Sequence, residues 1–141
     1  MRDEIAIMAE TTMIHPETGA VLTRQRRMET VEYMGRKKIV EVVGFFPADD
    51  GDAVFIGSDA DPMDDAFVEL RNLYRSEMKI LAKSVRKATR LTQKEASQLL
   101  TGSPNSFSKY ERGEAQPSWP TFLLLKLIAA DPSLIDKIKA A

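Results

Sequence analysis

The stretch from residue 91 to residue 113, LTQKEASQLLTGSPNSFSKYERG, constrains the fold of this chain more than any other feature. Thr92 precedes Glu95 by three residues, which is the pattern of a capping box at a helix start. Thr101-Gly102 then predicts a tight turn. Ser103-Pro104 predicts the N-cap and first position of a second short helix, which the final glycine ends. Two short helices joined in this way are typical of a helix-turn-helix unit, so we expect this part to bind duplex DNA.

The second of these helices is predicted to turn Phe107 and Tyr110 inward and to keep polar side chains outside. Asn105 and Lys109 lie one turn apart near its N-terminal half, the part that meets base edges. We expect them to contact bases, because Asn bonds adenine and Lys reaches guanine in the major groove. Contacts to the DNA backbone are expected from Gln93, Ser106, Ser108 and Arg112. The alternative is a solvated polar helix face.

The two halves of the chain differ in charge. Residues 1–75 hold 9 Lys/Arg and 15 Asp/Glu, whereas residues 76–141 hold 11 Lys/Arg and 6 Asp/Glu. The basic half suits a phosphate backbone, and the acidic half suits a basic partner or is simply a solvated surface.

A third helix is expected after Ser118-Trp119-Pro120, and residues 122–129 are apolar on almost every side. A helix of that kind is either deeply buried or shared with a partner. We expect Trp119 and Leu123 to form a homodimer interface, because helix-turn-helix proteins often pair to read two half-sites; ordinary core packing is the alternative. Asp131-Pro132 is expected to cap a last short helix.

The first half has the composition of a small β domain. Val21 to Tyr33 and Lys38 to Phe46, with a turn at Gly35, predict an antiparallel hairpin, and Ala53 to Ile56 predicts a short further strand. Residues 1–13 predict a frayed start or a short helix. The expected apolar core of this half is Val31, Tyr33, Ile39, Val42, Phe45, Phe55 and Ile56.

Asp61-Pro62 predicts the start of a helix over residues 62–88, either continuous or broken near Ser76. The expected fold class is therefore α+β: a small antiparallel β domain joined by a long helix to an all-α, five-helix domain. The helix-turn-helix pattern of this second domain resembles the Xre/Cro type. We expect a β-rich, partner-binding domain over residues 1–61, a connecting helix over 62–77, and a DNA-binding and dimerisation domain over 78–141.

Three motifs closely resemble the C-terminal half of MqsA/YgiT-type antitoxins, which belong to type II toxin–antitoxin pairs and carry an Xre-family helix-turn-helix. They are LTQKEAS at residues 91–97, NSFSKYERG at 105–113 and AQP at 115–117. The resemblance covers residues 78–137 well. It implies an antitoxin that neutralises an mRNA-endoribonuclease toxin, a basic protein of RelE-like fold, through the N-terminal domain. It also implies repression of its own operon at a palindromic operator.

Members of that family hold a structural zinc with four cysteines, and this chain has no cysteine. By resemblance the four ligand positions are His15, Thr18, Pro47 and Asp50. A structural zinc needs four N or S ligands, and proline offers none, so we expect no metal and no cofactor. A weak site on His15 and Asp50 is the alternative.

Contacts to the toxin are expected from the acidic residues Asp49, Asp50, Asp52 and Asp59. An alternative function is a stand-alone or phage-type Xre-family repressor whose N-terminal domain senses a ligand or dimerises. We do not expect an enzyme, because the chain has one His, no Cys and no glycine-rich phosphate loop. Residues 1–13 lack the features of a signal peptide, and no apolar run is long enough to span a membrane. A cytoplasmic, nucleoid-associated protein is expected.

Overall fold

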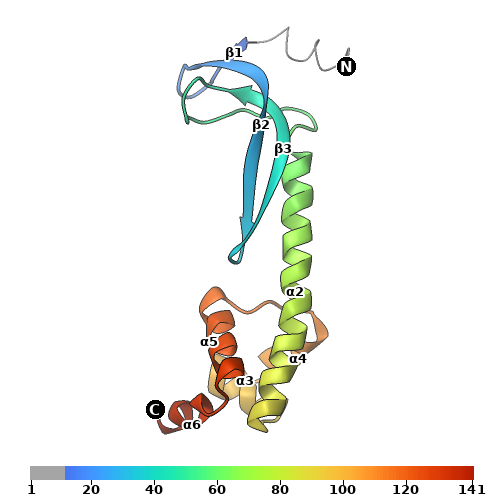
Figure 1. Ribbon diagram of the computed structural model, residues 1–141, viewed down its shortest axis with the longest axis vertical. Coiled ribbons are helices and arrows are strands. Elements are labelled where there is room, and N and C mark those ends of the chain that lie inside the picture. Colours follow the sequence, from blue (N-terminus) through green and yellow to red (C-terminus); the bar gives the residue numbers. More distant parts are fainter. Residues whose placement is uncertain (1–11) are drawn as a thin grey trace. The chain divides into compact units, whose positions relative to one another are not determined.

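The computed structural model describes residues 12–141, which divide into two compact units, one ending at Leu70 and one running from Arg71 to Ala141. Within this range a three-stranded antiparallel sheet is followed by five helices, so the predicted α+β class is confirmed (Figure 1). The expectation of a frayed start or short helix lies outside the described residues for 1–11. It is wrong for the next two residues, which belong to strand β1, Thr12–Ile14.

The first unit is built on a long hairpin. Strands β2 (Val21–Tyr33) and β3 (Arg36–Phe46) pair antiparallel, as predicted, with Tyr33 opposite Arg36. Met34 and Gly35 close the hairpin with φ angles of 48° and 80°, the left-handed pair of a type I′ turn. Strand β1 pairs with the first residues of β2 and completes a sheet of order β1-β2-β3.

One face of the hairpin packs on the start of helix α2, Asp61–Thr89. The ring of Tyr33 lies edge-on to Phe67 with centroids 5.1 Å apart, and Lys38 forms an ion pair with Glu69. Among residues 12–70 the buried apolar side chains are Leu22, Val42, Phe45, Phe46, Ala66 and Leu70.

The predicted core of this half is only partly correct. Val42 and Phe45 are buried, but Ile39 and Ile56 remain 64% and 52% exposed. Ile39 pairs with Thr30 and therefore points to the face opposite Val42, because side chains alternate along a strand. The half-buried members of the expected core are Val31, Tyr33 and Phe55.

The predicted strand from Ala53 to Ile56 is also wrong. Only Val54 pairs, in a single bridge to Phe45, with two backbone hydrogen bonds of 2.9 Å. The chain turns immediately afterwards, because the Ile56 amide donates to the Asp59 carboxylate at 2.9 Å and the segment then enters α2.

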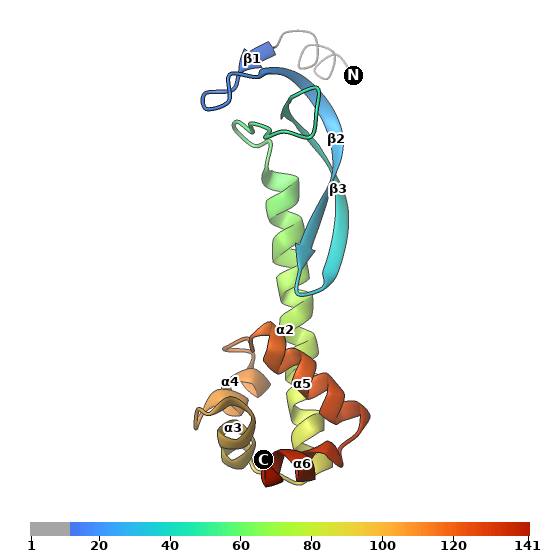
Figure 2. The ribbon, with the colours of Figure 1, turned by 90° about the vertical axis from the view of Figure 1, so that its left-hand side faces the viewer.

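The second unit consists of the remainder of α2 with α3 (Gln93–Thr101), α4 (Ser106–Arg112), α5 (Trp119–Ala130) and α6 (Leu134–Ala140). Figure 2 shows α3 to α6 grouped around the C-terminal part of α2. Helix α2 is one continuous element without a break at Ser76. It begins at Asp61 itself, one residue before the predicted start. No helix in residues 12–141 combines the length and apolar character that crossing a membrane requires.

Large side chains from α2, α4 and α5 form the core of the second unit. The Tyr74 hydroxyl donates to the Pro117 carbonyl at 3.2 Å, and its ring lies 5.1 Å from that of Phe122. Arg86 on α2 forms a 2.9 Å ion pair with Glu111 on α4. The largest fully buried side chains of this core are Tyr74, Phe107, Met78, Leu125, Ile128 and Val85.

Helix α6 starts later than predicted. Asp131 does not cap it; Ser133 occupies the N-cap position, and Asp131 instead accepts hydrogen bonds from the Ser133 amide and hydroxyl. Helix α5 begins as predicted, since the Ser118 hydroxyl accepts from the Thr121 amide.

Candidate nucleic-acid interface

Both ends of helix α3 are defined by local features that the sequence predicts. The Thr92 hydroxyl accepts from the Glu95 amide at 3.1 Å, and the Glu95 carboxylate accepts from the Thr92 amide at 3.2 Å. This capping box lowers the pKa of Glu95, chiefly through the Thr92 side chain. Gly102 ends α3 with a φ of 71°, so the predicted turn is confirmed.

The crossing of the two helices depends on Ser97, which sequence reasoning missed. Its side chain is fully buried, and its hydroxyl donates to the Gln93 carbonyl at 2.6 Å. The same oxygen accepts from the Phe107 amide at 2.9 Å, in the first turn of α4. Ala96 beside it is also fully buried, as expected for a close crossing.

The start of α4 differs from the prediction. Ser103-Pro104 belong to the turn, and α4 begins at Ser106 with Asn105 as its N-cap residue. The reason is that Thr101 organises the turn: its hydroxyl donates to the Ser97 carbonyl at 2.6 Å and accepts from the Ser103 amide at 3.3 Å. Asn105 makes no side-chain capping bond, so its exposed amide stays available at the helix N-terminus.

Three of the predicted DNA-contacting residues lie together. Gln93, Asn105 and Ser108 line one hollow of about 450 Å³, which Lys94 and Pro104 complete. Lys94 was missed, although its place beside Gln93 in the first turn of α3 could have suggested it. A cation beside an amide and a hydroxyl forms a suitable surface for a phosphate group.

The other predicted contacts differ in how strongly neighbouring groups hold them. Lys109 is exposed on α4. Ser106 is half-buried, and its hydroxyl lies 2.9 Å from that of Thr101. Arg112 donates to both carboxylate oxygens of Glu114 at 2.9 Å and also to the Ser108 hydroxyl.

Helix α5 carries an apolar stripe on successive turns. Trp119, Leu123 and Leu127 are 40%, 41% and 59% exposed, although all three are large apolar side chains. Trp119 stacks on the buried Phe122 with centroids 5.5 Å apart. Leu127 extends the pair that the sequence analysis proposed for a dimer interface.

The acidic residues of the first unit fall into two groups. Asp49, Asp50 and Asp52 are exposed in the loop after β3. Asp59, in contrast, accepts from the two terminal guanidinium nitrogens of Arg24, Nη1 and Nη2, at 2.5 and 2.6 Å, and its side chain is only 8% exposed. The hydrogen bonds from Arg24 lower the pKa of Asp59.

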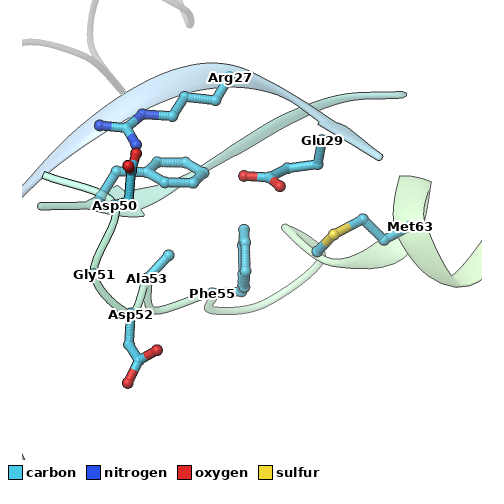
Figure 3. Close-up of a pocket in the computed structure, with 9 residues that line it drawn as sticks. Arg27, Glu29, Asp50, Gly51, Asp52, Ala53, Phe55 and Met63 are labelled. Atoms are coloured by element: carbon cyan, nitrogen blue, oxygen red, sulfur yellow. The ribbon is translucent and has the colours of Figure 1, made fainter. Parts of the chain in front are cut away.

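A pocket of about 370 Å³ opens beside this loop, between β2 and the start of α2 (Figure 3). Asp50 and Asp52 stand on its loop side, and Glu29 enters it from β2. Its remaining lining is Arg27, Phe46, Gly51, Ala53, Phe55 and Met63.

Three of the four positions that the resemblance aligns with zinc ligands accept hydrogen bonds within the protein, and the fourth, Asp50, is exposed in the loop after β3. The buried His15 accepts from the amides of Glu17 and Thr18 through Nδ1, at 3.1 and 3.2 Å. The Thr18 hydroxyl accepts from the Ala20 amide, and the Pro47 carbonyl accepts from Arg27. In residues 12–141 no three His, Asp or Glu side chains are grouped as metal ligands would be.

Comparison with known proteins identifies the family of this chain. Residues 15–139 match the model of a family described as the antitoxin component of a bacterial toxin–antitoxin system, MqsA. A curated relative, antitoxin MqsA of Escherichia coli (strain K12), is 47% identical over 55 residues. That match covers 39% of this chain and 42% of the relative. Since the family model spans both units of the fold, the chain belongs to the MqsA antitoxin family.

Proposed function

We propose that this protein is the antitoxin of a type II toxin–antitoxin pair and represses its own operon. The observation that carries the proposal is the match of residues 15–139, which includes both units, to the MqsA antitoxin family. In this proposal the protein acts by binding and has no catalytic role. Residues 1–61 bind the toxin, and residues 78–141 bind DNA and dimerise.

The proposed DNA interface is the surface formed by the N-terminal turns of α3 and α4. Asn105 and Lys109 would contact bases, because both are exposed, Asn105 at the N-cap of α4 and Lys109 one turn further along the helix. Gln93, Lys94 and Ser108 would hold a phosphate in the hollow that they share. The net positive charge of residues 76–141 supports binding to duplex DNA.

Ser106 and Arg112 are also proposed to contact the DNA backbone, although each already has a partner within the protein. Ser106 can turn its hydroxyl toward DNA only by giving up its contact with Thr101. Arg112 can reach a phosphate only in competition with Glu114.

The α5 stripe of Trp119, Leu123 and Leu127 is proposed as the homodimer interface. Exposed apolar side chains on three successive turns are costly in water and gain from a second copy. A dimer with two-fold symmetry would place two copies of α4 on a palindromic operator, in successive half-sites.

The toxin is proposed to be a basic RelE-like mRNA endoribonuclease that meets the acidic first unit. Asp49, Asp50 and Asp52 are the proposed contacts, because they are exposed and no Lys or Arg occurs between Lys38 and Arg71. Asp59 becomes a toxin contact only if Arg24 releases it.

Co-expression with the product of the adjacent small gene tests the proposal. We expect that product to arrest growth alone, and we expect this protein to restore growth and to co-purify with it. In a footprint on the promoter region, the protein should protect a palindrome. Protection without any toxic neighbour or complex would instead identify a stand-alone repressor.

A further inference from the structure

The pocket beside the loop after β3 combines apolar walls with a carboxylate. Phe55 and Met63 approach it from the loop and from the start of α2, and Glu29 approaches it from β2. Figure 3 shows the Glu29 carboxylate and the end of Met63 pointing into the space above Phe55, whereas Asp52 points out of it. The lining is therefore complementary to the two parts of a basic side chain: the apolar walls suit its alkyl stem, and the carboxylate suits its charged end.

The Glu29 carboxylate has no ion-pair or hydrogen-bond partner among the described residues. Its side chain is half-buried, and within residues 12–141 it forms no hydrogen bond and no ion pair. A carboxylate that is partly removed from water gains most from a cationic hydrogen-bond donor. The structure thus leaves an unmatched negative charge at the inner wall of a pocket of about 370 Å³.

Arg27 also lines the pocket, but its charge is already engaged. Its guanidinium lies 4.6 Å from the centroid of the Phe46 ring and donates to the Pro47 carbonyl at 2.7 Å. Two carboxylates, those of Glu29 and Asp50, outnumber this single cation even without Asp52, which points away from the pocket. The pocket therefore has a net negative lining that favours a cation.

We propose that this pocket receives one arginine or lysine side chain of the protein partner. The alkyl stem would pack on Phe55 and Met63, and the charged end would pair with Glu29, with Asp50 at the rim. The identity of the partner as the toxin rests on the proposed function, whereas the preference of the pocket for a cationic side chain does not.

The preference is tested first without any partner, on the whole chain. Ethylguanidinium is titrated while the Met63 methyl resonance is followed by NMR, with the neutral N-ethylurea as the matched probe. We expect saturable binding in the millimolar range for ethylguanidinium, at least about fivefold weaker binding to Glu29→Gln, and much weaker binding of the urea. Equal shifts with both probes, or none with ethylguanidinium at about 100 mM, would overturn the proposal.

The partner is tested next with the product of the adjacent small gene. Glu29→Gln should weaken the complex about tenfold or more, mostly through faster dissociation. The control is Glu32→Gln, which makes the same change on the same strand but on its other face, at an exposed position. If wild type forms no complex, the proposed function fails; if it does and both variants bind equally well, only the pocket assignment fails.

Discussion

Ser97 shows how one hydroxyl can hold two neighbouring helices, α3 and α4, together. We predict that Ser97→Ala destabilises the second unit by about 1–3 kcal/mol, because the buried Phe107 amide loses its acceptor. Urea unfolding followed by Trp119 fluorescence measures the loss. The control is Ser84→Ala on an exposed face of α2, which gains the same helix propensity without losing this bond. Equal stability of the two variants would refute the role of Ser97.

Asn105 is the residue that we expect to read sequence. Asn105→Ala should cost about 1–3 kcal/mol of specific operator binding and leave non-specific binding nearly unchanged. Lys94→Ala should weaken binding to both DNAs and reduce the salt dependence by about one counterion. Fluorescence anisotropy at several salt concentrations separates the two patterns. The same loss on both DNAs for Asn105→Ala would show that it makes no base contact.

At the scale of elements, the pair of Arg24 and Asp59 ties β2 to the turn before α2. Asp59→Asn should destabilise the first unit by about 3 kcal/mol at pH 7, because Arg24 would lose its partner at an almost buried position. The control is Glu41→Gln, whose exposed pair with Arg26 should contribute less than about 1 kcal/mol. Urea unfolding followed by NMR signals of β2 gives both values.

The ion pair between Arg24 and Asp59 should make the stability of the first unit depend on pH. The pKa of Asp59 is lowered in the folded unit, so below about pH 4 the unfolded chain binds protons more readily. The stability that Asp59 contributes is complete above that pH and is lost as pH falls through the lowered pKa. Wild type and Asp59→Asn should therefore converge in stability toward pH 2. A constant difference between pH 7 and pH 2 would contradict this assignment.

Gly44 allows the loop after β3 to lie on the sheet. A Cβ atom there would stand 2.7 Å from Cε1 of Phe55. We predict that Gly44→Ala costs about 1–3 kcal/mol and disturbs the pocket through Phe55. NMR signals of Phe55 and Met63 report the change. The double variant Gly44→Ala/Phe55→Leu should recover part of the loss, and no recovery would mean that this contact does not set the loop.

The sequence predicts elements well where a local signal defines their ends. Thr92 and Glu95, Gly102, and Ser118 act within one turn of the chain, and the structure confirms all three signals. The sequence predicts the start of a helix poorly where that start depends on side chains of another helix. The start of α4 depends on Thr101 and Ser97, which belong to the preceding helix.

The same limit applies to the first unit. Ile39 is as apolar as Val42, but only the register of the hairpin decides which of them faces α2. Asp59 is one acid among many in the sequence, and its pairing with Arg24 joins positions 35 residues apart. The candidate DNA residues could be named from the helix-turn-helix pattern, whereas the pocket at Glu29 needed three segments brought together by folding.

At the scale of the whole molecule, we expect the proposed dimer to determine how the protein would bind an operator. Leu123→Glu should give a monomer, because a charge in the centre of the α5 stripe cannot be buried against a second copy. Sedimentation velocity measures the mass, and binding to a full palindrome should fall toward that of a half-site. Met28→Glu, another exposed apolar position but in the first unit, is the control and should remain dimeric. A wild-type monomer would refute the interface.

The turn at residues 15–19 has a consequence for the conditions under which the first unit can fold. The bonds that close it run from backbone amides to an imidazole nitrogen, a hydroxyl and a carbonyl. Neither a chelator nor a thiol oxidant acts on such groups, and the chain contains no cysteine. Zinc starvation and peroxide stress would disrupt a structural zinc site with four cysteine ligands. Neither condition should break the hydrogen bonds that close this turn.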